Sequence, residues 1–162
     1  TGLLNFAPVI QGQVDATAAT DTGLLVGKLK GLGDVNVINV ADSLNIPSDM
    51  FVVTEAYYMA NKPLLKRFLE AYRNSAAWMI AEPEEAAKIA ITRSINGRNE
   101  GINLAIIKIR NISSQSETTR SKGLGHFDID LLQKGAETFK ELGLIKADLD
   151  MRALIKSDLI PK

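Results

Sequence analysis

The stretch VDATAATDTGLLVGKLKGLGDVNVINV, residues 14–40, decides the fold class that the sequence predicts. From Val14 to Thr20, small and apolar residues alternate with others, which is typical of a strand closely covered on both faces. Leu24–Leu32 has the pattern of a short helix that ends at Gly33, and alternating valine and isoleucine over Val35–Val40 indicate a second strand. Strand, helix and strand in this order predict a βαβ unit with parallel strands.

The chain beyond this unit is predicted to be mainly helical. A third strand is expected at Met50–Thr54, and after it apolar residues recur at helical spacing. Asn61 is expected to cap a helix, with Pro63 in its first turn, where a missing N–H costs little. Further helices are expected to begin at Pro83, to cover Ile102–Ile109 and to begin at Asp128, and the polar run Ser113–Lys122 is expected to be an exposed loop.

Composition excludes several classes of protein. A chain of 162 residues with 46% hydrophobic and 23% charged residues has the make-up of a folded domain or two small lobes. Nineteen basic and nineteen acidic residues give no electrostatic case for nucleic acid or an anionic membrane as partner. Without cysteine, and with His126 as the one histidine, we expect no disulfide, no metal site and no thiolate or histidine-centred catalysis. We also expect no cofactor.

The predicted sheet is incomplete. Three strands make a poor sheet, because the outer strands leave backbone groups unpaired. We therefore expect the sheet to be completed by further chain or by a partner. The sequence begins with Thr1 rather than methionine, which indicates a processed form or a piece of a longer protein.

Several short segments carry a family resemblance. They are QGQVDA (11–16), FVV (51–53), NKPLLKRFL (61–69), WMIAEPEEAA (78–87) and ELGLI (141–145). In their order and spacing, the segments up to residue 87 resemble the C-terminal half of the type II periplasmic substrate-binding proteins of ABC importers. The later ELGLI resembles the C-terminal motif of the same family. The branch that they resemble handles nitrate, sulfonate, taurine and thiamine-pyrimidine precursors.

The resemblance implies an α/β fold of the type II periplasmic-binding class, present here in part. Residues 1–46 would belong to the second, βαβ lobe, and residues 47–162 would supply a strand and helices of the first lobe and the C-terminal tail. Family members are much longer than this chain. The missing N-terminal half, or self-association in its place, is therefore an expected partner.

The function implied by the resemblance is solute binding without catalysis. Two lobes would close about a hinge around a small polar solute and deliver it to an ABC permease at the membrane. Such a protein is periplasmic, or extracytoplasmic and lipid-anchored. Two alternatives use the same scaffold: the effector-sensing domain of a transcription regulator, and an enzyme like the pyrimidine synthases of thiamine biosynthesis, which rely on histidine and on a cysteine-rich segment.

The sharpest candidate ligand-binding residues are Thr20, Asp21 and Thr22. They follow the first predicted strand, and ligands of open α/β sheets bind beyond the C-terminal ends of strands. A carboxylate there would accept hydrogen bonds from an amine or aminopyrimidine and would repel nitrate or sulfonate. The alternative is that one of the three simply caps the following helix. The resemblance places an aromatic residue and a proline beside the acid, and this chain has threonines instead.

A second candidate pair is Ser48 and Asp49, which precede the third predicted strand. The resemblance places a crossover between the lobes here, lining the ligand cleft. Turn chemistry alone explains a proline, serine and aspartate in sequence equally well. Both readings stay open at this point.

Overall fold

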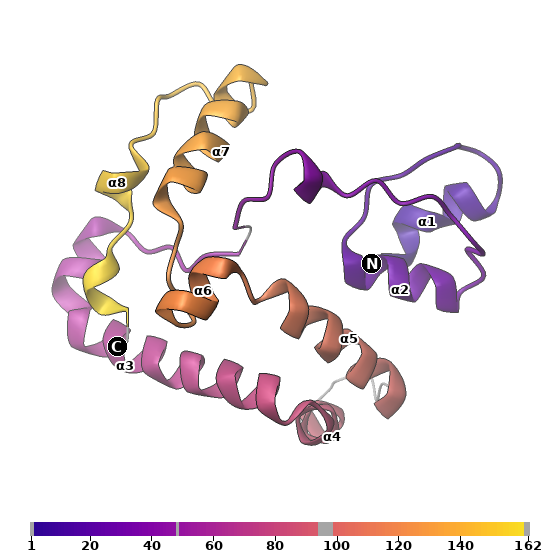
Figure 1. The fold of residues 1–162 in the computed structure, drawn as a ribbon, viewed down its shortest axis with the longest axis horizontal. Helices are drawn as coiled ribbons and strands as arrows, with labels where there is room; N and C mark the ends of the chain where they lie inside the picture. The colour runs from indigo at the N-terminus through magenta and orange to yellow at the C-terminus, as the bar shows by residue number, and fades with distance from the viewer. Residues whose placement is uncertain (1, 48, 94–98, 161–162) are drawn as a thin grey trace. The chain divides into compact units, whose positions relative to one another are not determined.

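The computed structural model describes residues 2–47, 49–93 and 99–160, and these residues form helices joined by irregular segments (Figure 1). The α-helices are α1 (Gly2–Ile10), α2 (Asp21–Leu29), α3 (Glu55–Ala81), α4 (Pro83–Arg93), α5 (Glu100–Ser113), α6 (Glu117–Lys122), α7 (Ile129–Glu141) and α8 (Met151–Leu154). Two short 3-10 helices are η1 (Val40–Asp42) and η2 (Ser157–Leu159). None of these helices is both long and apolar enough to cross a membrane.

The predicted α/β fold class is wrong, because no residue of the described ranges is in a β-strand. The segments Val14–Thr20 and Met50–Thr54 are irregular, and Val35–Val40 is irregular up to the start of η1, so there is no βαβ unit. Alternating β-branched residues favour a strand, but a strand forms only when a neighbour pairs with its backbone groups. Here Ile38 is 93% exposed and Val52 is 85% exposed, so no neighbouring strand covers either side chain.

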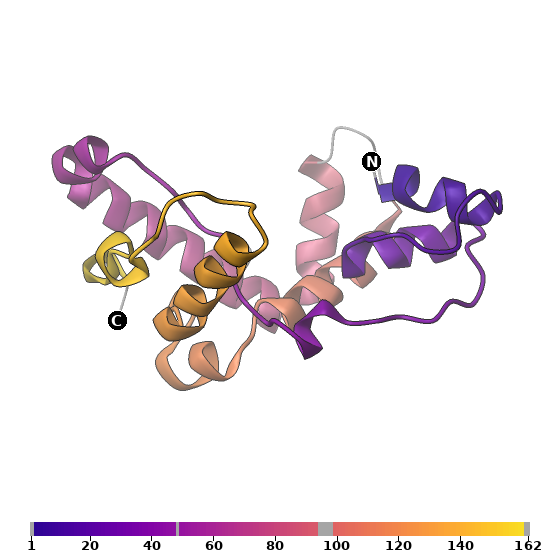
Figure 2. The same cartoon turned by 90° about the horizontal axis from the view of Figure 1, so that it is seen from above.

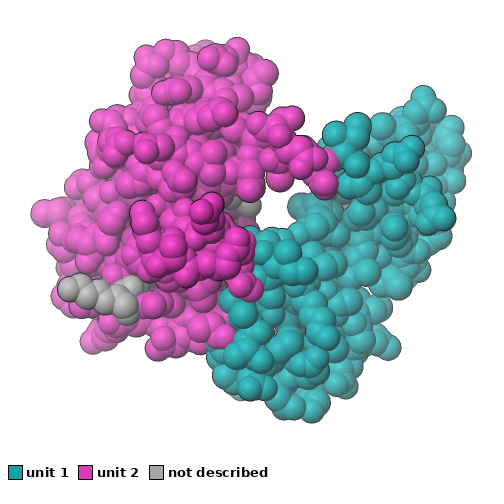
Figure 3. Space-filling view, viewed as in Figure 1, with its two compact units in different colours: residues 1–38, 78–114 teal, residues 39–77, 115–162 magenta. Residues whose placement is uncertain are grey.

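The chain divides into two compact units, which Figure 3 colours separately. Unit 1 contains residues 1–38 and 78–114, and unit 2 contains residues 39–77 and 115–162. Each unit therefore combines two stretches that are distant in sequence. The lobe boundary expected between residues 46 and 47 is a different kind of division, and it stays a prediction.

In unit 1, a large aromatic residue packs on a glycine-containing helix face. Phe6 of α1 is 5% exposed and lies against Gly23 and Gly27 of α2. A Cβ atom on Gly27 would lie 2.8 Å from the Phe6 ring, so only glycine allows this close approach. α1 and α2 lie side by side in Figure 1, and Figure 2 shows the same pair beside the N-terminus.

The other part of unit 1 is the pair α4 and α5. Ala86 and Ala87 are buried, and their small side chains allow the two helices to approach closely. Asn111 of α5 donates a hydrogen bond through Nδ2 to the carbonyl oxygen of Met79, at 3.0 Å. The sequence predicted both helices, and the start of α4 at Pro83 is confirmed.

Unit 2 contains η1, α3 up to residue 77, and the helices from α6 to η2. Phe51 packs edge-on against Phe68 and Tyr72 of α3, with ring centroids 5.0 and 4.8 Å apart. On α7, Gly135 lies against Ile46, whose Cδ1 atom would be 3.0 Å from an added Cβ. The irregular chain before α3 is thus held at two points by apolar contacts within its own unit.

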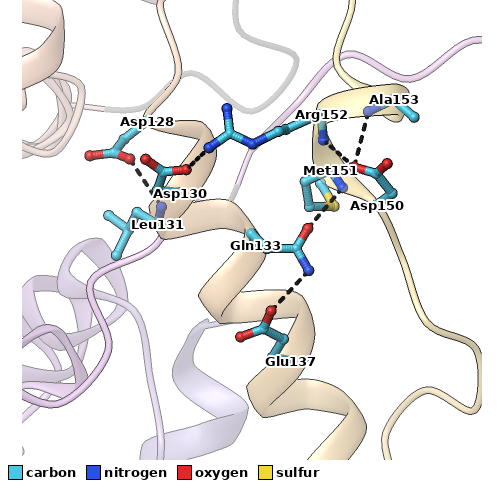
Figure 4. Close-up of polar contacts among 9 residues, drawn as sticks. All are labelled: Asp128, Asp130, Leu131, Gln133, Glu137, Asp150, Met151, Arg152 and Ala153. Atoms are coloured by element: carbon cyan, nitrogen blue, oxygen red, sulfur yellow. Dashed lines mark hydrogen bonds and ion pairs between the residues drawn. The ribbon is translucent and has the colours of Figure 1, made fainter.

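α8 is held on α7 by polar contacts, which Figure 4 shows. The backbone N–H of Met151 donates to Oε1 of Gln133 at 3.0 Å, and Arg152 forms an ion pair with Asp130. Asp150 caps α8 by accepting from the N–H groups of Arg152 and Ala153. The tail therefore folds back on α7 instead of trailing away from it.

Capping residues at the helix starts explain which helices the sequence predicted and which it missed. α7 begins after Asp128, whose carboxylate accepts from the N–H of Leu131 at 3.0 Å, as expected of an N-cap. The predicted loop Ser113–Lys122 is wrong, because it contains α6. Ser116 and Thr119 form a capping box there, each side chain accepting from the other's backbone N–H. Two hydrogen bonds at the helix start compensate for the lack of apolar residues.

The sequence predicted that Asn61 caps the start of a helix, and this prediction is wrong. α3 begins at Glu55, and the N–H of Tyr57 donates to the hydroxyl of Thr54 there, at 3.2 Å. Asn61 instead interrupts α3, with φ −128° and ψ 22°, and Pro63 follows inside the helix. The helix expected after Asn61 is therefore the longer part of a bent helix.

Candidate functional site

The first candidate site is the start of α2, and Thr20 is its N-cap. Thr20 has an extended backbone, and its hydroxyl oxygen accepts the N–H of Gly23 at 3.2 Å. The hydroxyl oxygens of Thr20 and Thr22 lie 3.3 Å apart. Thr20 therefore has the structural role that the sequence offered as an alternative to ligand binding.

Asp21 is the first residue of α2, and each of its carboxylate oxygens accepts a hydrogen bond. Oδ1 accepts the N–H of Thr22 at 2.7 Å, and Oδ2 accepts the hydroxyl of Ser113 at 2.5 Å. Ser113 is the last residue of α5, so this bond connects the start of α2 to the end of α5. The sequence missed Ser113 because it lies 92 residues from Asp21, and no local pattern marks such a distant contact.

The cluster of Thr20, Asp21 and Thr22 is rich in hydrogen-bond acceptors. The N–H groups of Thr22 and Gly23 at the start of α2 are already bonded to its own side chains. An anion would need such groups, because free N–H groups are what a helix start offers to negative charge. Each carboxylate oxygen of Asp21 still has a lone pair, since an oxygen of this kind can accept more than one hydrogen bond. The geometry favours a donor, such as an amine, over an anion.

Of the second candidate pair, Ser48 and Asp49, the structure describes Asp49 alone. Ser48 lies outside the described residues. Asp49 is exposed in the irregular segment that precedes α3, and it belongs to unit 2, whereas Thr20–Thr22 belong to unit 1. Ligand contact by Ser48 and Asp49 stays a prediction.

Metal-ligating side chains do not gather in the described part of the chain. No group of three or more histidine, cysteine, aspartate or glutamate residues there could hold a metal ion. Nδ1 of His126 lies 3.1 Å from the carbonyl oxygen of Gly123, within the loop before α7. The predicted absence of a metal and of a cofactor stays a prediction.

A third polar cluster, which the sequence did not indicate, surrounds Asp158 in unit 2. Oδ1 of Asp158 accepts the hydroxyl of Tyr58 at 2.6 Å, and Oδ2 lies 3.1 Å from Nζ of Lys62. The Tyr58 hydrogen bond and then the Lys62 ammonium hold the pKa of Asp158 below its ordinary value. In return, bonds to Tyr58 and Asp158 raise the pKa of Lys62. This carboxylate is used within the fold, at the junction of the C-terminal segment and α3.

Comparison with known proteins supplies the family. The profile described as NMT1/THI5 like matches residues 1–86, which include Thr20–Thr22 and Asp49. Among curated proteins, the riboflavin-binding protein RibY of Chloroflexus aurantiacus (strain ATCC 29366 / DSM 635 / J-10-fl) is 26% identical over 137 residues. Those residues are 83% of this chain and 39% of RibY, so the chain spans well under half of that relative's length. No solved structure matches.

Proposed function

The chain belongs to the NMT1/THI5 like family, and from this membership we propose that it forms part of a protein that binds a small solute without converting it. The observation that carries the proposal is the agreement of the family match with a relative whose printed name is a binding protein. The resemblance of residues 11–16, 51–53, 61–69 and 78–87 to solute-binding proteins of ABC importers supports the same function. Hinge closure around the solute, delivery to an ABC permease and a periplasmic location are parts of this proposal.

The chemistry at the start of α2 narrows the class of solute. Asp21 is exposed and negatively charged, and the N–H groups of Thr22 and Gly23 are engaged by side chains. A solute that donates hydrogen bonds or carries positive charge is therefore a better match than nitrate or a sulfonate. Ser48 and Asp49 remain proposed as further contacts.

A complete solute site is proposed to need more polypeptide than this chain. The chain corresponds to 39% of RibY. In addition, Ile38 and Val52 are 93% and 85% exposed in irregular segments whose sequences favour strands. Large exposed apolar side chains of this kind are usually covered by a neighbour. The proposed neighbour is the remainder of a longer chain or, failing that, a second copy.

The test is titration calorimetry on the natural gene product that contains this sequence. The panel contains riboflavin, an aminopyrimidine, a primary amine, taurine and nitrate. We expect saturable binding of riboflavin, the aminopyrimidine or the primary amine, and recovery of the ligand unchanged after incubation. Chemical conversion of the ligand, or a preference for nitrate or taurine, would contradict the proposal.

A further inference from the structure

α3 contains a bend that its own sequence explains. Asn61 has non-helical backbone angles, and Pro63 has no N–H to donate to the carbonyl oxygen of Met59. The side chain of Asn61 donates through Nδ2 to the carbonyl oxygen of Tyr57 at 3.0 Å. The bend therefore separates a short first segment, Glu55–Ala60, from the long remainder of the helix.

The short first segment needs support from outside itself. A helix of less than two turns is unstable in water, because nucleation costs more than so few hydrogen bonds return. Within α3, Tyr58 is the buried residue, with 7% of its surface exposed. Tyr58 lies in this first segment, so the contacts of its side chain decide where the segment sits.

The side chain of Tyr58 is contacted by the C-terminal segment, residues 156–159. The Tyr58 hydroxyl donates to one oxygen of Asp158, while Lys62, just beyond the bend, is paired with the other oxygen. One carboxylate thus binds a residue on each side of Asn61. Figure 1 shows this C-terminal segment, in yellow, beside the start of α3.

Two further contacts strengthen the same junction. Nζ of Lys156 lies 5.8 Å from the centroid of the Tyr58 ring, which is a cation–π distance. Nζ of Lys156 lies 3.7 Å from Oε2 of Glu55, the first residue of α3. Leu159, next to Asp158, is 8% exposed and anchors the segment in the unit.

We propose that Asp158 acts as a latch that fixes the angle of α3 at Asn61, and that removing its carboxylate lets the first segment of α3 reorient. The latch is a conformational device of unit 2. Tyr58, Lys62 and Asp158 all lie in unit 2, and the proposal rests on their contacts rather than on the proposed function. Pro63 leaves one backbone hydrogen bond of α3 unmade, so the angle at the bend depends on contacts from outside the helix.

The test is a distance measurement across the bend by pulsed electron paramagnetic resonance. The chain has no cysteine, so Ala56→Cys and Asn74→Cys introduce the only two labels, both at exposed positions. The labelled sites are separated by about 27 Å of helix rise, within the range of the method. We expect a narrow distance distribution in the otherwise unmodified protein. In Asp158→Ala the distribution should shift or become at least twice as wide.

Asp148→Ala is the matched control, because Asp148 forms an exposed ion pair in the same unit, and its partner Lys140 lies on α7 rather than on α3. This variant should leave the distribution unchanged. If Asp158→Ala loses helical circular dichroism, Tyr58→Phe takes its place, since it removes only the hydroxyl that Asp158 binds. An unchanged distribution in the folded variant used, or equal broadening in Asp148→Ala, would overturn the proposal.

Discussion

Asp21 in unit 1 and Asp158 in unit 2 are built alike but are used differently. In each carboxylate, the two oxygens accept from different residues: one donor to Asp21 lies on a distant helix, and both donors to Asp158 do. The donors to Asp21 are a backbone N–H and a serine hydroxyl, both neutral and exposed. Asp158 binds the hydroxyl of a buried tyrosine and a lysine ammonium. The difference indicates that Asp158 serves the fold, while Asp21 keeps the negative charge that a ligand could use.

The largest effect that would sharpen this comparison is expected from Tyr58→Ala. Tyr58 is 7% exposed, and truncating a buried aromatic side chain removes contacts and leaves a cavity. We expect a loss of about 3 kcal/mol in the free energy of unfolding, measured with urea. Tyr57→Ala is the control, because Tyr57 is 45% exposed and should cost far less. Equal losses in the two variants would contradict the claim that Asp158 binds a tyrosine whose burial stabilises unit 2.

Gly27→Ala in unit 1 is expected to lower the free energy of unfolding by less than Tyr58→Ala does. The new Cβ would lie 2.8 Å from the Phe6 ring, so either the ring or the helix must shift. Overpacking of this kind costs about 1–3 kcal/mol. Lys28→Ala, at an exposed position of the same helix, should be near neutral by thermal melting. A neutral Gly27→Ala would mean that α2, and with it Asp21, is not positioned by Phe6.

Thr20→Ala separates capping from the chemistry of Asp21. The Thr20 hydroxyl caps α2, and losing such a cap costs about 1 kcal/mol. Thr20→Ser keeps the oxygen and should restore the melting temperature. Thr22→Ala should cost less, because the Thr22 side chain has no backbone N–H to accept. If Thr22→Ala were the more destabilising change, the cap assignment would be contradicted.

The smallest effect is a pH dependence that belongs to Asp158. Its pKa lies below the ordinary value of 3.8, so the stability it adds is present above that value and is lost as pH falls through the lowered pKa. Lys62 acts in the opposite sense, because its pKa is raised above 10.5 and its contribution is lost as pH rises through the raised pKa. The difference in melting temperature between wild type and Asp158→Asn should therefore be largest near neutral pH. A constant difference down to strongly acidic pH would contradict this assignment.

The sequence predicted what local chemistry determines. Asp128 marks the start of α7, and Pro83 marks the start of α4, because N-caps and first-turn prolines act on their own helix. The strands failed because a strand needs a partner, and Val35–Val40 finds none in the described chain. The capping box of α6 was readable, but its polar composition resembled a loop.

The polar clusters were predictable only in part. Thr20 and Asp21 stand out because capping and acidic residues occur together there. Ser113, which binds Asp21, does not stand out in the sequence. It comes close to Asp21 only because α2 packs on α5. Tyr58 and Asp158 are separated by 100 residues, and each is ordinary in its local context. Contacts of that range arise from tertiary packing and leave no pattern in the sequence.

The most direct test of the account measures affinity and melting temperature together for Asp21→Asn and Asp158→Asn in the natural gene product. Asparagine removes the charge at both positions and keeps one of the two acceptor oxygens. Asp21→Asn should weaken binding of the best panel ligand by about ten- to a hundredfold, the loss of a charge-assisted hydrogen bond, with the melting temperature nearly unchanged. Asp158→Asn should lower the melting temperature and leave the affinity intact. Unchanged affinity in Asp21→Asn would contradict the account and leave Asp21 with a structural role alone.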